Sequence, residues 1–177
     1  MMIPVILDEV ACRICCIQYD EGEKSLKYLE SVKDCFGVFV SVKKGHDIYG
    51  CLGSWSDNIL DKGELYYLIM HLCQSIMNGK DPRSIEKLAV PFTVEISFMI
   101  LPLIPAVPDA YFDNEKYGLM VLCGGKRATF LPKVYGNISW DVISTCLMKK
   151  AGIDEKNEEV LFNAYDAICV SKDFVVV

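Results

Sequence analysis

The segment from Phe36 to Leu52 constrains the fold of this chain more than any other. Its first part, Phe36 to Val42, reads FGVFVSV and is rich in the β-branched and aromatic residues that favour strands. Lys44 to Asp47 supplies the glycine and polar residues of a tight turn, and Ile48 to Leu52 is largely apolar again. The pattern predicts a β-hairpin whose second strand carries Cys51.

Helices are predicted where apolar residues recur at every third or fourth position, because this spacing places them on one helical face. The segments with this pattern are Val5 to Tyr19, Glu64 to Asn78 and Ser139 to Lys150. The polar cluster from Asp20 to Ser25 is expected to end the first helix. Gly79 is expected to stop the second, and Gly152 is expected to be the C-cap of the third.

Strands are predicted in the remaining apolar segments. These are Pro91 to Ile100, Gly118 to Cys123, Arg127 to Leu131 and Val160 to Val170. In the first, apolar side chains alternate with Thr93, Glu95 and Ser97, which predicts a strand with one polar face. The second and third are joined by Gly124-Gly125-Lys126 and are expected to form another hairpin.

These elements together predict an α+β fold with a mostly antiparallel sheet and flanking helices. A chain of 177 residues has the size of one domain, so a single domain over residues 1–177 is expected. The prolines at 102, 105 and 108 are expected to make a stiff connection between strands, with a polyproline ligand as the alternative.

Composition narrows the class of protein. With 52% hydrophobic and 24% charged residues the chain is globular, and no apolar run approaches the roughly 20 residues of a membrane span. Residues 1–10 lack the basic region and cleavage site of a secretory signal, so a cytoplasmic location is expected. The formal net charge of −6 is opposite to the basic surface that nucleic-acid binding requires.

The nine cysteines show no paired framework and are expected to be reduced thiols. Several lie in apolar stretches and are expected to be small buried hydrophobic residues, namely Cys15, Cys73, Cys146 and Cys169. Cys12-Arg13-Ile14-Cys15-Cys16 would bring thiols to one helical face. No second pair follows at zinc spacing, so neither a metal site nor a cofactor is predicted.

A set of short blocks is more informative than any single motif. The blocks are Gly37-Val38-Phe39-Val40, Gly50-Cys51-Leu52-Gly53, Asp81-Pro82-Arg83, Val94-Glu95-Ile96-Ser97, Gly118-Leu119, Leu131-Pro132-Lys133-Val134, Trp140 and Lys150-Ala151-Gly152. In their order and approximate spacing, from Phe36 to Gly152, the chain resembles the AMME-syndrome chromosomal-region family and is identified as carrying an AMMECR-type domain.

The resemblance implies a compact α+β domain with a larger and a smaller sub-structure, inside the cell and without an agreed enzymatic activity. In prokaryotes such domains are associated with Memo-type proteins and radical-SAM enzymes, so a partner of one of these kinds is expected. Two positions depart from the family pattern. Tyr49 stands where the family usually has Arg before the Gly-Cys pair, and Tyr117 stands where it commonly has His before the Gly-Leu pair.

Cys51 is the candidate catalytic residue. Gly50 and Gly53 can let its strand approach another backbone closely, which would place a thiol beside main-chain N–H donors. The alternative is that both glycines mark a bulge or close packing against a helix and that Cys51 fills a tight core space. A nucleophilic thiol also needs a base, and only His46 and His71 are present.

Arg83 and Glu95 complete the candidate ligand-binding set with Gly50 and Gly53. The planar donor fork of Arg83 suits a carboxylate, either on a ligand or on Glu95. A structural ion pair and a polar ligand site look identical in sequence. Two functions therefore remain open: a small-molecule-binding or thiol-based enzymatic domain, and a non-catalytic protein-interaction domain.

Overall fold

The computed structural model describes residues 7–9, 11, 22–45, 47–79, 91–106, 111–154 and 159–174. The elements in chain order are α2 (Gly22–Leu29), β1 (Cys35–Lys44), β2 (Asp47–Trp55), α3 (Lys62–Met77), β3 (Phe92–Pro105), β4 (Tyr111–Asp113), β5 (Gly118–Cys123), β6 (Lys126–Phe130), β7 (Asn137–Ser139), α4 (Trp140–Ala151) and β8 (Leu161–Phe174). Residues 7–9 and 11 are also helical. Within the described residues, the helices are too short or too polar to span a bilayer.

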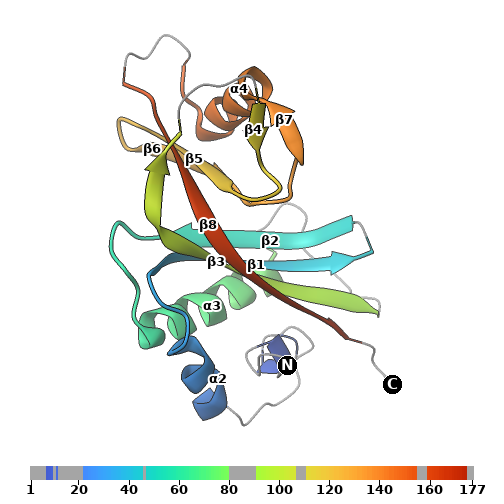
Figure 1. Ribbon diagram of the computed structural model, residues 1–177. Helices are drawn as coiled ribbons and strands as arrows, with labels where there is room; N and C mark the ends of the chain where they lie inside the picture. Colours follow the sequence, from blue (N-terminus) through green and yellow to red (C-terminus); the bar gives the residue numbers. More distant parts are fainter. Residues whose placement is uncertain are drawn as a thin grey trace. The chain divides into compact units, whose positions relative to one another are not determined.

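The strands form one large sheet and one small one (Figure 1). Among the described residues the large sheet has six strands in the order β2-β1-β3-β8-β5-β6, and β4 pairs with β7 in the small sheet. Strands β1 and β2, β4 and β7, β5 and β6, and β5 and β8 pair antiparallel, which confirms the predicted α+β fold with a mostly antiparallel sheet. The register of the first hairpin places Ser41 opposite Cys51 and Val42 opposite Gly50.

The chain divides into two compact units. The larger comprises Met1–Met99 and Ile168–Val177, and the smaller comprises Ile100–Ala167. This division confirms the expected larger and smaller sub-structures, and β3 and β8 each contribute residues to both units. That residues 1–177 make one domain stays a prediction.

The larger unit buries alternate residues of its strands beneath helices α2 and α3. We call this side the apolar face, and it carries Val38, Val40, Val42, Gly50, Leu52, Val94, Ile96 and Phe98. The valines of β1 and the apolar residues of β3 on this face are fully buried. Helix α3 contacts both strands of the hairpin, and the Tyr28 ring of α2 lies 6.4 Å from the Phe98 ring.

Helix α3 begins with a capping box. The Asp61 carboxylate accepts hydrogen bonds from the backbone N–H groups of Gly63 and Glu64, and the Glu64 carboxylate accepts one from the backbone N–H of Asp61. Its predicted apolar side is confirmed, because Leu65, Ile69 and other residues at this spacing are buried.

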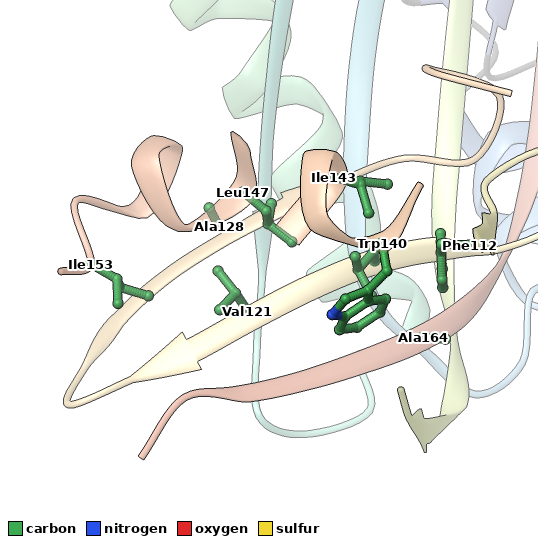
Figure 2. Packing of buried hydrophobic residues seen from close by; sticks show 9 residues of the cluster. Phe112, Val121, Ala128, Trp140, Ile143, Leu147, Ile153 and Ala164 are labelled. Carbon is green, nitrogen blue, oxygen red and sulfur yellow. The ribbon is translucent and has the colours of Figure 1, made fainter. Parts of the chain in front are cut away.

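The smaller unit has its own core between helix α4 and the sheet (Figure 2). Trp140 packs edge-on against Phe112 and Phe162, while Ile143 and Leu147 of α4 are fully buried. The hairpin of β5 and β6 was predicted correctly: Gly124 and Gly125 have φ values of 53° and 82°, the left-handed region that a two-residue turn requires.

Buried polar groups of the smaller unit fix its remaining strands and loops. The fully buried Tyr165 ring lies where a Cβ on Gly118 would approach it to 2.2 Å, so this position requires glycine. The Tyr165 hydroxyl is 2.7 Å from the Thr129 hydroxyl. The side chain of buried Asn114 donates to the carbonyl oxygens of Tyr117 and Leu131 and accepts from two backbone N–H groups of the loop at 133–136.

Some predictions about local structure were wrong. Helix α2 begins at Gly22, inside the polar cluster that was expected only to end a helix. Strand β3 continues to Pro105, so Pro102 and Pro105 lie in a strand and not in a connection after it; Pro108 lies outside the described residues.

The prediction for the cysteines holds only in part. Cys73 is buried as expected, but Cys146 and Cys169 are exposed. Cys146 lies on the side of α4 away from the buried Ile143 and Leu147, and Cys169 lies in a strand whose side chains alternate between two faces. Cys12, Cys15 and Cys16 lie outside the described residues.

Candidate functional site

The second face of the sheet in the larger unit gathers the predicted site residues. We call it the polar face, and it carries Phe39, Ser41, Lys43, Cys51, Gly53, Trp55, Thr93, Glu95, Ser97, Cys169, Ser171 and Asp173. These residues alternate with those of the apolar face along β1, β2 and β3, because successive side chains of a strand point to opposite sides. Contacts between neighbouring strands link them in pairs.

Cys51 forms one of these pairs with Ser41. The Ser41 hydroxyl donates a hydrogen bond to Cys51 Sγ across the hairpin, with a distance of 3.1 Å. The serine is 3% exposed, whereas the cysteine is half-buried. The thiol therefore lies beside a buried hydroxyl in a residue that is itself only partly buried. That Cys51 fills a tight core space stays an alternative.

The glycines beside Cys51 have packing roles on opposite faces. A Cβ on Gly50 would lie 2.7 Å from Ile76 Cγ2 of α3, so Gly50 allows the helix to approach β2 closely. A Cβ on Gly53 would lie 2.1 Å from the Phe39 ring, so Gly53 lets this ring lie against the strand. The alternative of close packing against a helix thus describes Gly50 but not Gly53, which packs against β1 and shares a face with Cys51.

Glu95 is paired with a residue that the sequence analysis did not select. Its Oε1 lies 2.8 Å from Lys43 Nζ, and the two side chains are about a quarter exposed, at 25% and 29%. Glu95 shares the polar face with Thr93 and Ser97, as the alternation predicted. Arg83, the expected partner, lies outside the described residues, so the structure tests neither its contact with Glu95 nor its role.

Two further pairs extend the polar face to β8. The Thr93 hydroxyl donates to Asp173 Oδ1 at 2.5 Å, and the Ser97 hydroxyl is 3.4 Å from Cys169 Sγ. Ser97 is 2% exposed, whereas Cys169 is exposed. The face thus carries a second thiol beside a buried serine, as at Cys51 and Ser41.

Cys35 shows what full burial does to a thiol in the same unit. It begins β1, is 0% exposed, and donates a hydrogen bond to the carbonyl oxygen of Gly37 at 3.2 Å. Burial raises the pKa of Cys35 to about 11, because the thiolate would lose its hydration; its hydrogen bonds to backbone groups offset only part of this effect. Cys35 is therefore a structural thiol.

Comparison with known proteins identifies the family of this chain. The sequence pattern that defines the AMMECR1 family matches residues 9–170 of the chain. The chain belongs to the AMMECR1 family. Its blocks are divided between the two units: Gly50–Gly53 and Val94–Ser97 lie in the larger, while Gly118-Leu119 and Leu131–Val134 lie in the smaller.

One similar protein sequence and one similar solved structure add to this comparison. Protein CA_C1420 of Clostridium acetobutylicum is 30% identical over 127 residues, which are 69% of this chain and 25% of that protein. The chain thus spans about a quarter of that relative's length. The solved structure of the uncharacterized protein PH0010 from Pyrococcus horikoshii is 16% identical with a TM-score of 0.68 and covers 98% of this chain and 97% of that one. At this identity the likeness shows the fold alone.

The structure describes Tyr49 and Tyr117, the two residues that depart from the AMMECR1 pattern. The hairpin register shifts after Val42, so that Gly50 and Ile48 have partners while Tyr49 is the extra residue of a β-bulge. Tyr117 is half-buried, and Lys116 Nζ lies 4.7 Å from the centre of its ring. Tyr49 belongs to the larger unit and Tyr117 to the smaller.

Of the two histidines, only His71 belongs to the described residues, and it does not lie beside Cys51. His71 is exposed on α3, the helix that covers the apolar face, and its ring stacks on Tyr67 with centroids 6.3 Å apart. His46 lies outside the described residues, so its position relative to the thiol is not tested.

Sequence reasoning missed Ser41, Lys43 and Asn114. The first two were detectable, because FVSVK alternates apolar and polar side chains and therefore puts Ser41 and Lys43 on one face. Asn114 gives no comparable signal, since an asparagine after a short strand reads as an ordinary turn residue.

Proposed function

We propose that this AMMECR1 chain binds a small molecule on the polar face of its larger unit and that Cys51 is the group that reacts with it. The observation that carries the proposal is the half-buried Cys51 thiol, which accepts a hydrogen bond from the buried Ser41 hydroxyl at 3.1 Å. A directed hydrogen bond and incomplete burial of the residue are two features expected of a nucleophilic thiol.

The reaction class that fits is acyl transfer to sulfur. The sulfur attacks the carbonyl carbon of an acyl compound, the new C–S bond forms, and the bond from that carbon to the leaving group breaks. The leaving group departs with the electron pair and takes up the proton released by the thiol. The Ser41 hydroxyl supports the step, because a hydrogen bond donated to sulfur stabilises the charge it carries before attack.

The remaining predicted site residues take supporting roles in this proposal. Gly53 leaves room for the Phe39 ring beside Cys51, and Gly50 lets helix α3 pack closely on β2. Glu95 and its partner Lys43 offer a charged acceptor and donor to a ligand. Arg83 is retained as a ligand-binding residue from its family block.

We further propose that the chain works inside the cell beside a Memo-type protein or a radical-SAM enzyme. The family resemblance supports this partnership. Its match to about a quarter of CA_C1420 is compatible with a domain that acts together with others. The partner would supply or consume the acyl compound, and no cofactor is assigned to the chain itself.

The test is the rate at which Cys51 reacts with iodoacetamide between pH 5 and 9, read by peptide mass spectrometry. Cys169, exposed on the same face, is the internal reference, and Cys51→Ser is the control that identifies the peptide. We expect Cys51 to react several-fold faster than Cys169 at pH 7. Modification of Cys51 only after unfolding would contradict the proposal.

The alternative, a non-catalytic interaction domain, is favoured by one feature of the smaller unit. The loop at 131–136 is held by the buried Asn114, and it exposes Val134 and Tyr135 by 51% and 43%. Apolar side chains fixed in solvent are typical of docking surfaces. A Memo-type partner whose binding is lost in Val134→Asp but unchanged in Cys51→Ser would support this function over the first.

A further inference from the structure

The order of side chains along the hairpin constrains what the proposed site can bind. On the polar face, β1 carries Phe39, Ser41 and Lys43 in sequence, and Gly53 and Cys51 lie opposite the first two. Two residues along a strand span about 6.6 to 6.8 Å. The thiol therefore has an aromatic group about one such step away on one side and an ion pair about one step away on the other.

The aromatic side is a stacked pair beside the thiol. The rings of Phe39 and Trp55 have centroids 6.3 Å apart and planes 26° from parallel. Both residues are half-buried, so part of each ring surface contacts solvent. Gly53 is essential here, because a Cβ would lie 2.1 Å from the Phe39 ring and would displace it. A flat group extending from a carbon at Cys51 toward Gly53 would meet the Phe39 ring.

The other side excludes an apolar group. Lys43 and Glu95 form a partly exposed ion pair at 2.8 Å, and covering it with an apolar surface would remove both charges from water. A ligand with one apolar and one polar end thus has a preferred direction on the strand. Its apolar end lies over the rings, and its polar end lies at the ion pair.

We infer that the polar face takes an acyl compound whose carbonyl carries a flat, apolar group of the size of one aromatic ring. This inference rests on the proposed function, because it names the substrate class of the same thiol. Contact with the Phe39 ring, which itself stacks on Trp55, positions the carbonyl carbon over Cys51 Sγ. Offset and edge-on ring contacts favour this arrangement beyond the apolar area that they bury.

The experiment compares two alkylating agents that share a leaving group. Iodoacetamide and N-phenyl iodoacetamide both lose iodide when sulfur forms its bond to carbon, and they differ by one aromatic ring. Rate constants are measured for Cys51, for Cys169 and for free cysteine at pH 7.5. At each thiol, the rate constant for the phenyl reagent is divided by that for iodoacetamide. We expect this ratio to be roughly ten times higher at Cys51 than at Cys169 or free cysteine, the effect of one aromatic contact.

The matched variant is Phe39→Leu, which removes the ring beside Gly53 and keeps an apolar side chain. We expect its ratio at Cys51 to fall to that of Cys169. In the unaltered chain, acetanilide should slow the reaction of Cys51 with iodoacetamide while acetamide should not, which provides a second readout that does not depend on the variant folding.

The outcomes separate this inference from the proposed function. If Cys51 reacts readily but its ratio equals that of Cys169 and acetanilide gives no protection, the substrate class is wrong and the thiol site stands. If Cys51 reacts with neither reagent in the folded chain, the site and its substrate class both fail.

Discussion

The two faces of the sheet in the larger unit are made from alternate residues of the same strands, yet they differ in nearly every physical respect. On the apolar face, Val40 and Ile96 are fully buried beneath helices. On the polar face, the neighbouring residue Ser41 donates a hydrogen bond to the Cys51 thiol, and Glu95 pairs with the ammonium group of Lys43. A single strand therefore contributes to folding with one set of residues and to the candidate site with the other.

Because of this difference, neighbouring residues of one strand should affect different properties, namely the stability of the fold on one face and the reactivity of the candidate site on the other. Substitutions on the apolar face should change the free energy of unfolding, because they leave cavities in a close-packed core. Substitutions on the polar face should change reactivity or ligand binding with small effects on stability.

The largest effect is expected from Ile96→Ala on the apolar face. Ile96 is 0% exposed, and its truncation should lower the free energy of unfolding by about 2–5 kcal/mol through lost burial and a residual cavity. Thr93→Ala, three residues away and on the polar face, removes a hydrogen bond to Asp173 and should cost about 1 kcal/mol. Urea denaturation measures both, and equal losses would show that the faces are not distinct.

The next effect concerns the buried thiol Cys35. Its pKa is raised from an ordinary 9.0 to about 11, so both states hold the proton below pH 9. Between pH 9 and 11 the unfolded chain loses this proton while the folded chain keeps it. The free energy of unfolding should therefore fall with rising pH, by roughly 2–3 kcal/mol in total.

The measurement is urea denaturation of the unaltered chain and of Cys35→Ala from pH 8 to 11 under reducing conditions. The difference between the two stabilities should shrink through this window, because the variant lacks the titrating group. A difference that stays constant with pH would show that Cys35 titrates alike in both states.

A smaller effect is expected for the serines that support the thiols. Ser41→Ala removes the hydroxyl that donates to Cys51 and should slow alkylation of Cys51 by about three- to tenfold, the rate equivalent of one hydrogen bond. Ser97→Ala, the same change beside Cys169, should leave the rate at Cys51 unaltered. If both variants slow Cys51 equally, the effect is a general loosening of the sheet.

The smallest effect is expected from Glu95→Gln. A partly exposed pair such as Lys43 and Glu95 contributes no more than about 1 kcal/mol, and salt screens it. The loss of stability should be under this value at low salt and should vanish in 1 M NaCl (roughly a 3 Å Debye length). A loss above about 2 kcal/mol at either ionic strength would make the pair a structural element.

Much of the larger unit was predictable because its strands alternate clearly. The hairpin, the apolar side of α3 and the polar side of β3 all follow from periodicity. The bulge at Tyr49 does not, because a one-residue irregularity depends on the pairing of two strands and leaves no mark in either alone.

The candidate site was predictable only in part for a related reason. Cys51 and Glu95 came from family blocks. Alternation could have placed Ser41 and Lys43 on one face, but their pairing with Cys51 and Glu95 became visible only when the strands were placed side by side. Cross-strand neighbours are fixed by register, and register is a tertiary property. The same limit explains why Cys169 was expected in the core.

The division of the chain into units has a consequence for its synthesis. The larger unit needs Ile168–Val177, which are translated after the whole of the smaller unit, whereas the smaller unit is complete once residue 167 has emerged. The core around Trp140 can therefore close first, although most of the larger unit is translated earlier. Residues 1–99 must wait, with the apolar sides of their strands incompletely covered, and this interval is when a nascent chain has most need of a chaperone.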